Sequence, residues 1–291
     1  MLILLIIINL LWASTFIFGK ILLNDFSIPV SFIISFRFLV AGITVGLIFW
    51  KKINLSKNVI WKGSVIGSIN GLAMIFQLVG LQYTTASNSG FLTATYILFL
   101  PFVEKLFWRN KIRNIVLVSV VTAFLGVYLL SVSNFGTLEF NVGDIYTIAC
   151  GITFAFQIMF ISHFTKEKNM YSLIFIQFMA SAAMGFGYLG YEMLVIGESI
   201  DFGVIFEPKV ISTLVFLAIF ATFIPFSLQF YVQKKVNPTI AGLAYLMEPV
   251  FTVILAVIFL SEGFGWQTFF GILLILSGIV MVNIKKKAVT I

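Results

Sequence analysis

The feature that most constrains this chain is a succession of apolar stretches, each long enough to cross a lipid bilayer, that runs along its whole length. A helix of about 20 residues, rising 1.5 Å per residue, spans the roughly 30 Å hydrocarbon core. Of the 291 residues, 60% are hydrophobic and 10% are charged, whereas about 25% are charged in a typical soluble domain. We therefore predict an all-α integral membrane protein.

Windows of about 20 apolar residues predict ten transmembrane helices. The connections between them are short, as in up-and-down helical hairpins, and none is long enough for a soluble domain. The first stretch lacks the basic start and cleavage site of a signal peptide, so we expect a retained helix. The predicted helices are 1–23, 29–50, 62–82, 87–107, 112–131, 143–163, 170–191, 209–232, 238–260 and 265–284.

The charged residues alternate between the two sides of the predicted membrane. All Lys and Arg except Lys20, Arg37 and Lys209 flank the even-numbered connections or follow the last helix. The other side carries Asp25, Glu139, Asp144, Glu192, Glu198, Asp201, Glu207 and Glu262. The positive-inside rule then predicts a multi-pass inner (plasma) membrane protein with cytoplasmic N- and C-termini, and Lys20 is its local exception. This placement accounts for the net charge of +7 without a nucleic-acid partner.

Two glycines recur at one offset and indicate an internal repeat. Gly90 lies 152 residues before Gly242, and Gly126 lies 152 residues before Gly278. We predict a first five-helix repeat at 1–131 and a second at 143–287. Because five is odd, the second repeat enters the membrane from the opposite side, which favours a binding site between the repeats and alternating access. Chance similarity between apolar segments is the alternative.

Four sets of residues stand out as motifs: Leu-Trp-Ala-Ser-Thr-Phe at 11–16 with Lys20, the pair Arg37-Phe38, the stretch from Leu81 to Pro101, and Tyr-Leu-Met-Glu-Pro-Val at 245–250 through Glu262, Gly271 and Gly278. Over nearly the whole chain these motifs resemble those of the EamA branch of the drug/metabolite transporter superfamily. One departure is that the first half carries Asn110-Lys111 where the second carries Glu262. The resemblance implies a ten-helix secondary carrier, often an exporter of amino acids or related metabolites.

Glu248 is the strongest single candidate because a charge at the centre of a transmembrane helix costs about 2.5 to 3.5 kcal/mol on insertion scales. Tyr245 and Thr252 lie three residues before and four after it, on the same helical face. Pro249 donates no backbone hydrogen bond, so it frees a carbonyl one turn earlier. The carboxyl group could bind a coupling proton or a substrate ammonium group; a packing role for a protonated side chain is the alternative.

Two further charged residues are predicted to serve coupling or gating. Arg37 could pair with Glu248, bind an anionic group or extend toward the membrane surface, and a structural or gating salt bridge is the favoured interpretation. Glu104, next to Lys105 at the end of the fourth predicted helix, is interpreted as a surface ion pair or an inner gate.

Polar and aromatic residues within the predicted spans form the expected solute site. Asn70 and Gln77 lie seven residues apart on one helical face, and Asn70 could serve either packing or the cavity. Such groups suit amphipathic or zwitterionic solutes. The predicted substrate-binding residues are Trp12, Ser14, Asn70, Gln77, Asn88, Tyr96, Gln157, Gln177, Gln229, Tyr245 and Glu248.

Small residues and a proline mark close packing and a bend. Gly63, Gly67 and Gly71 share one helical face at four-residue spacing, a pattern typical of tightly packed membrane helices, and Gly42 and Gly46 repeat it. Pro225 predicts a kink in the eighth helix.

Other classes of function lack their signatures. With one histidine, His163, and one cysteine, Cys150, the chain has no set of ligands for a Cys/His metal site, and we expect no metal and no cofactor. The chain has no GxxxxGK[ST] phosphate loop, so ATP does not drive it directly. A secondary transporter for a small solute, with the proton as a candidate coupling ion, is the favoured function; a membrane-embedded enzyme or a non-transporting scaffold is the alternative.

Overall fold

The computed structural model describes residues 1–108, 113–132, 141–166, 169–197 and 200–287 of the chain. Arg109, Asn110, Lys111, Glu139 and Glu198, which entered the charge and repeat predictions, lie outside the described residues, as does Lys168. Within the described ranges every regular element is a helix. The prediction of an all-α chain is confirmed for this part of the protein.

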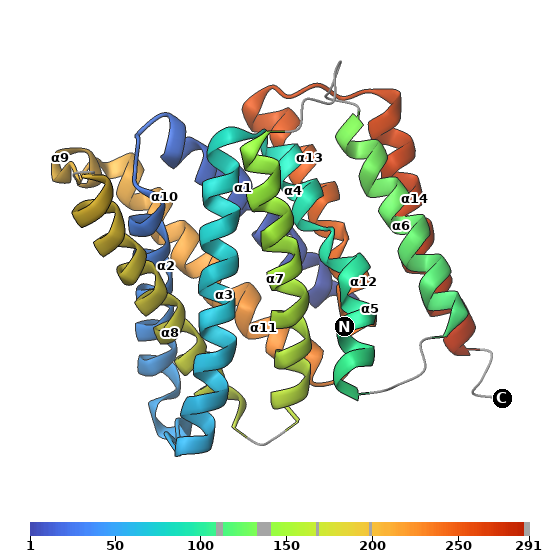
Figure 1. Cartoon of the computed structure of the whole chain (residues 1–291), viewed down its shortest axis with the longest axis horizontal. Coiled ribbons are helices and arrows are strands. Elements are labelled where there is room, and N and C mark those ends of the chain that lie inside the picture. Colours follow the sequence, from blue (N-terminus) through green and yellow to red (C-terminus); the bar gives the residue numbers. More distant parts are fainter. Residues whose placement is uncertain (109–112, 133–140, 167–168, 198–199, 288–291) are drawn as a thin grey trace.

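The helices run back and forth along one common direction (Figure 1). Three short elements differ from α-helix: η1 is a 3₁₀ turn, and η2 and η3 are π-helical. The elements are α1 (Leu2–Asn24), α2 (Val30–Phe49), η1 (Trp50–Lys52), α3 (Lys57–Tyr83), α4 (Ala86–Thr93), α5 (Tyr96–Trp108), α6 (Asn114–Val132), α7 (Val142–Phe164), α8 (Met170–Tyr191), η2 (Glu192–Ile196), α9 (Phe202–Ile205), α10 (Pro208–Ala218), η3 (Ile219–Phe223), α11 (Ile224–Gln233), α12 (Pro238–Tyr245), α13 (Met247–Leu260) and α14 (Trp266–Lys287).

Eight helical segments of the described chain are long and apolar enough to cross a membrane. They correspond to eight of the ten predicted spans. The other two predictions, 112–131 and 265–284, fall on α6 and α14, whose apolar parts, Asn114–Leu129 and Trp266–Met281, are shorter. The protein is therefore a multi-pass membrane protein.

The structure contains the helices predicted at 87–107, 209–232 and 238–260, and each of them is interrupted. The first divides into α4 and α5, and the last divides at Leu246 into α12 and α13. Pro249 explains the second break, because it cannot donate to the carbonyl of Tyr245 four residues earlier. The segment 209–232 passes through the π-helical turn η3 just before Pro225.

The glycine seams predicted from the sequence are confirmed, and both face α8. A Cβ atom on Gly67 would lie 2.5 Å from the Gln177 carbonyl oxygen, and one on Gly63 would lie 2.6 Å from Ile176. Gly42 on α2 meets the Met179 side chain of the same helix at 2.8 Å. Helix α8 of the second half is thus held between α2 and α3 of the first half.

The repeat glycines make reciprocal contacts. A Cβ on Gly90 in α4 would lie 3.0 Å from Thr252 in α13, and one on Gly242 in α12 would lie 2.6 Å from Leu100 in α5. Thr252 follows Leu100 by 152 residues, the same offset that relates the two glycines. Each short helix of one half therefore packs against the longer helix that follows the break in the other half.

Helices α6 and α14 pair in the same reciprocal way, side by side at the right of Figure 1. A Cβ on Gly126 would lie 2.6 Å from the Gly271 oxygen, and one on Gly278 would lie 2.7 Å from the Ser119 oxygen. Gly271 and Ser119 are again 152 residues apart. A side chain at Gly126 or Gly278 would therefore push the two backbones apart.

We expect Gly67→Ala to destabilise the fold, because its methyl group would overlap backbone atoms of α8 that cannot move independently. Overpacking of this kind typically costs about 1 to 3 kcal/mol, and a lower melting temperature of the detergent-solubilised protein measures it. Gly187→Ala on α8 is the control, because its added Cβ meets no atom within 4 Å. Equal melting temperatures for the two variants would contradict the close contact.

Candidate functional site

A small cavity of about 30 Å³ lies in the interior, between the broken helices and the helices around them. Its lining comes from α1, α2, α3, α4, α5, α7, α11, α12 and α13, so both halves of the chain contribute. All of the lining residues are buried or half-buried. They are Trp12, Thr15, Arg37, Met74, Gln77, Thr93, Tyr96, Phe154, Ile158, Phe226, Gln229, Tyr245 and Glu248.

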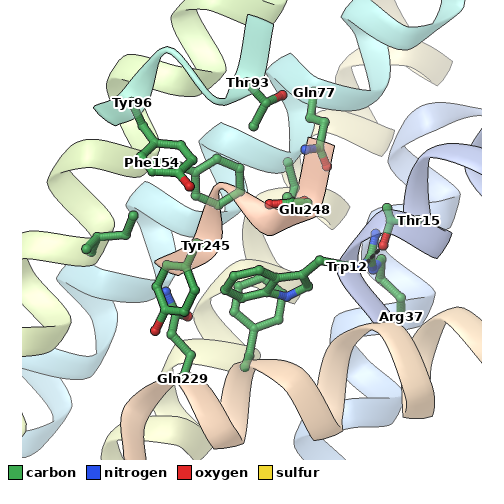
Figure 2. A pocket seen from close by; sticks show the side chains of 13 residues that line it. Trp12, Thr15, Arg37, Gln77, Thr93, Tyr96, Phe154, Gln229, Tyr245 and Glu248 are labelled. Carbon is green, nitrogen blue, oxygen red and sulfur yellow. Dashed lines mark hydrogen bonds between the residues drawn. The ribbon is translucent and has the colours of Figure 1, made fainter. Parts of the chain in front are cut away.

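Aromatic rings form much of the wall (Figure 2). The indole ring of Trp12 lies between Phe226, at a centroid distance of 5.3 Å, and Tyr245, at 5.2 Å in an edge-to-face arrangement. The Tyr96 hydroxyl donates to the Gly242 carbonyl at 3.1 Å, which ties α5 to α12. Trp12 and Phe154 border both of the apolar clusters of the fold, so the cavity lies where these clusters meet.

Glu248 lies in the first turn of α13, immediately after the break. A carboxyl group in the first turn of a helix is favourably placed relative to the helix dipole. Within the described chain, its carboxyl oxygens form no hydrogen bond and no ion pair, although only 9% of the residue is exposed. The carboxyl group therefore faces the cavity with its hydrogen-bonding capacity unused.

Arg37 is 1% exposed and is held by hydroxyl and carbonyl groups rather than by a carboxylate. Its Nε donates to the Thr222 hydroxyl at 2.7 Å, and its Nη2 donates to the Ala221 carbonyl at 3.2 Å and to the Thr15 hydroxyl at 3.4 Å. The pairing of Arg37 with Glu248 that the sequence left open is not formed in this structure.

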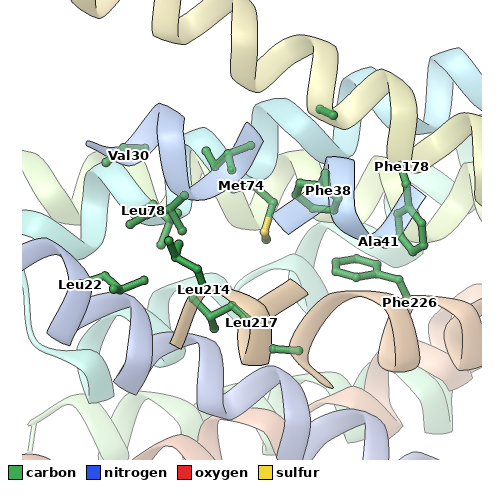
Figure 3. Close-up of a cluster of buried hydrophobic side chains, with 14 of the residues drawn as sticks. Leu22, Val30, Phe38, Ala41, Met74, Leu78, Phe178, Leu214, Leu217 and Phe226 are labelled. Carbon is green, nitrogen blue, oxygen red and sulfur yellow. The ribbon is translucent and has the colours of Figure 1, made fainter. Parts of the chain in front are cut away.

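The π-helical turn η3 supplies two of these acceptors. Pro225 cannot donate to the carbonyl of Ala221 four residues earlier, and Arg37 donates to that carbonyl instead. Thr222 accepts from Arg37 while donating to the Leu217 carbonyl. Figure 3 shows the apolar cluster around this region, in which Phe38, Phe178 and Phe226 pack together.

Seven of the sequence-predicted residues line the cavity, and the structure brings them together from seven helices. They are Trp12, Arg37, Gln77, Tyr96, Gln229, Tyr245 and Glu248.

Asn70 and Gln157 stand behind this wall. Gln157 exchanges hydrogen bonds of 3.3 and 3.1 Å with the lining residue Gln229, and also donates to Asn70. Asn70 donates in turn to Ser181, which donates to the Gly67 carbonyl. The chain of bonds links four helices and fixes the orientation of Gln229.

Three predicted residues lie away from the cavity lining. The Ser14 hydroxyl donates to the Leu11 carbonyl of its own helix. Asn88 donates to Asp144 at 2.7 Å and so ties α4 to α7. Gln177 is fully buried on α8, and both atoms of its amide lack a hydrogen-bond partner.

Glu104 reaches the other half of the chain at one end of the molecule. It accepts hydrogen bonds from the backbone N–H, at 3.3 Å, and the hydroxyl of Thr239, in the first turn of α12. At the opposite end, Glu262 accepts from the backbone N–H of Ala86, the first residue of α4, at 3.1 Å. Each short helix thus begins at a carboxylate from the other half.

Lys20, the exception to the charge pattern, has a local explanation. Its ammonium group donates to the carbonyls of Leu81 at 2.8 Å and Thr84 at 2.7 Å, at the C-terminal end of α3. A cation is favourable there because the last carbonyls of a helix lack partners. Lys20 and Glu262 line the same surface depression at this end.

Six lining residues were missing from the sequence-predicted set: Thr15, Met74, Thr93, Phe154, Ile158 and Phe226. Helical spacing could have indicated two of them, because Thr15 follows Trp12 by three residues and Met74 precedes Gln77 by three. The apolar members carry no signal that separates a cavity wall from ordinary core.

The arrangement is suited to binding rather than to metal chemistry. Among the residues that the structure describes, no three His, Cys, Asp or Glu side chains are grouped so that they could hold a metal ion. The cavity instead combines one guanidinium, one carboxyl group, amides and hydroxyls with aromatic walls. This combination can bind a small molecule that has both polar and apolar parts.

Comparison with known proteins gives consistent matches. The model of the EamA-like transporter family matches residues 1–132 and again residues 141–284. An uncharacterized transporter of Archaeoglobus fulgidus is 31% identical over 279 residues, which cover 96% of this chain and 84% of the relative. The uncharacterized transporter YetK of Bacillus subtilis is 28% identical, with 94% and 84% covered. A solved crystal structure superimposes with a TM-score of 0.77 at 16% identity, covering 99% of this chain and 98% of that one, which supports the fold alone.

We expect Gln157→Leu to destabilise the protein, because it removes the partner of the Gln229 amide and one donor to Asn70. A buried polar group left without a partner typically costs about 1 to 3 kcal/mol, which thermal unfolding in detergent would detect. Thr153→Val on the same helix is the control, because the Thr153 hydroxyl bonds only within α7, to Ala149. A melting temperature for Gln157→Leu as high as that of the control would refute the supporting role.

Proposed function

The chain belongs to the EamA-like transporter family, and from that premise we propose that it is a secondary transporter that exports small metabolites such as amino acids or related amphipathic solutes. One observation carries the proposal: an interior cavity lined from both halves of the chain, where the Glu248 carboxyl group has no partner among the described residues.

The proposed topology is ten transmembrane helices in two inverted five-helix repeats, 1–131 and 143–287, with both termini in the cytoplasm of an inner-membrane protein. The helices α6 and α14 would then be the fifth and tenth spans. The twofold match of the family model and the reciprocal contacts of Gly90 with Thr252 and of Gly242 with Leu100 support this arrangement. Two contacts related by one sequence offset are expected for repeats that face each other across a pseudo-two-fold axis.

We propose alternating access in which the two short helices α4 and α12 move at opposite ends of the cavity. Glu262 holds the start of α4, and Glu104 holds the start of α12. A carboxylate that accepts from the free N–H groups of a helix start is stabilised there by charge and by the hydrogen bond. Both contacts are present together in this structure, as an occluded state requires. Releasing one of them opens one end.

Glu248 is proposed to couple transport to a proton or to bind the cationic group of the solute. A carboxylate in this dry position is costly unless a cation, a proton or water accompanies it. Among the residues that the structure describes, none pairs with the carboxyl group to serve this purpose. A proton or a solute ammonium group therefore fits the site.

We expect the purified protein in liposomes to accelerate the uptake of at least one solute from a panel of amino acids and related metabolites, with and without a proton gradient. The variant Glu248→Gln keeps the size of the side chain and removes its charge. It should retain expression and lose most of the gradient-driven component, at least about tenfold, as expected for the loss of one buried charge interaction.

Trp12→Ala and Tyr245→Ala are expected to weaken solute binding more than they lower the melting temperature.

An unchanged dependence of uptake on pH in Glu248→Gln would remove Glu248 from the coupling role. A protein that moves no solute under either condition would favour a non-transporting scaffold over a transporter.

We expect Glu262→Gln and Glu104→Gln to shift access to the cavity toward opposite sides of the membrane. A cysteine at Gln77, in a Cys150→Ser background, would report access through its rate of reaction with a membrane-impermeant maleimide. Loss of a charge-assisted hydrogen bond, about 1.5 kcal/mol, corresponds to about a tenfold change in the opening equilibrium.

Asp25→Asn is the matched control, because Asp25 lines the same depression as Glu262 and its side chain bonds to no helix start. The control should leave the reaction rate unchanged on both sides. Faster labelling from the same side in Glu262→Gln and Glu104→Gln would contradict the two-gate arrangement.

A further inference from the structure

Within the described residues, one amino group of Arg37 has no hydrogen-bond partner. Nε and Nη2 together make three hydrogen bonds, whereas Nη1 is buried and makes none. Arg37 lines the cavity, and Figure 2 places it beside Thr15 at one end of the cavity. Up to two N–H groups of a guanidinium are therefore available there.

A purely structural role does not account for this geometry. A salt bridge would bring a carboxylate to Arg37, yet no described residue forms an ion pair with it. The charge also lies near the Phe38 ring, whose centre is 5.5 Å from the guanidinium carbon. A buried donor without a partner is unfavourable, so the fold retains an arrangement that an anionic ligand would relieve.

A second donor without a partner lines the same cavity. The indole Nε1–H of Trp12 is buried and makes no hydrogen bond to any described residue. Trp12 lies on α1 and Arg37 on α2. In Figure 2 the Trp12 ring lies between Tyr245 and Arg37. Two unused donors of this kind favour an acceptor with several lone pairs, and a carboxylate has about four such sites.

We propose that Arg37 is the subsite for the carboxylate group of the transported solute, with Nη1 donating to a carboxylate oxygen and the Trp12 indole supplying a further donor. The inference rests on the proposed function and makes that function more specific, because it assigns one end of the solute to one end of the cavity. Thr222, Ala221 and Thr15 hold the guanidinium in place through Nε and Nη2, and these bonds leave Nη1 available to donate to a carboxylate oxygen.

The rest of the cavity then accepts the remainder of the solute. Glu248 is the only carboxyl group among the lining residues, so it is the partner for a solute ammonium group. The rings of Phe154, Phe226 and Tyr245 contact an apolar side chain. The substrate class that fits is a zwitterion with a carboxylate at one end, and an amine without a carboxylate lacks the Arg37 interaction.

Three probes that differ in one group test the assignment: L-phenylalanine, L-phenylalaninamide and 2-phenylethylamine, with L-leucine and L-leucinamide as a second series. Thermal stabilisation of the full chain in detergent, titrated with each compound, gives relative affinities by mass action. The wild type is expected to bind the carboxylate compounds at least about tenfold more tightly than the amides and the amine, as a charge-assisted hydrogen bond predicts.

Arg37→Gln should abolish this preference, and Trp12→Phe should reduce it by about threefold. Lys209→Gln is the control for loss of one positive charge, because Lys209 is exposed at the start of α10; it should keep the full preference. If Arg37→Gln does not fold, Arg37→Lys replaces it, and a weaker preference in that variant supports the assignment.

Equal affinity of the wild type for the three phenylalanine-related compounds, a preference that survives in Arg37→Gln, or no binding by either series would overturn the subsite. Transport of 2-phenylethylamine in liposomes with no preference for phenylalanine would overturn it while leaving the transporter function intact. Absence of transport for every solute would overturn both.

Discussion

The structure depends on one constraint, that a backbone surrounded by lipid must satisfy its own hydrogen bonds. A helix can be interrupted only where the interior offers replacement partners. The breaks between α4 and α5 and between α12 and α13, and the π-helical turn η3, all meet this condition, because they lie within the bundle and next to the cavity. The partners that the interruptions need are also the groups that give the interior its chemistry.

The same constraint explains why the charged residues of the interior are where they are. Arg37 donates to a carbonyl of η3, and Glu104 and Glu262 accept from the first N–H groups of α12 and α4. Lys20 similarly donates to the last carbonyls of α3. Glu248 differs from these four residues, because no backbone or side-chain group in the described chain accompanies its carboxyl group. Its position is therefore not explained by helix termination.

The sequence predicted the positions of the eight spans that the described chain contains, because a transmembrane span is a long and local signal. It also predicted the glycine seams and the effect of Pro249, since both depend on spacing within one segment. The break after Thr93 was not predictable, because the nearest proline, Pro101, lies beyond the start of α5. The charge pattern made Lys20 an anomaly, because the carbonyls that it binds belong to another helix.

Candidate site residues were harder to predict because polarity indicates that a side chain needs a partner without indicating which partner it has. Gln229 and Gln157 look alike in the sequence, yet one lines the cavity and the other supports it from behind. Asn88 and Ser14 form their hydrogen bonds away from the cavity, with Asp144 and Leu11. Phe154 and Ile158 line the cavity with no polar signal at all. Only the packing of the helices around the cavity shows which side chains line it and which do not.

The unpaired state of Arg37 and Glu248 bears on how an exporter of zwitterions would work. An empty cavity holds one cation and one carboxyl group, and neither is neutralised by the other. Closing that cavity removes water from both, which is unfavourable for isolated charges in a low-dielectric interior. A zwitterion that pairs with both groups at once lowers this penalty. A solute with one charge pairs with one group only, so the desolvation penalty of the other group remains. A ligand shifts a conformational equilibrium by its difference in affinity between states, so the occluded state would be reached more readily with the matching solute than without it.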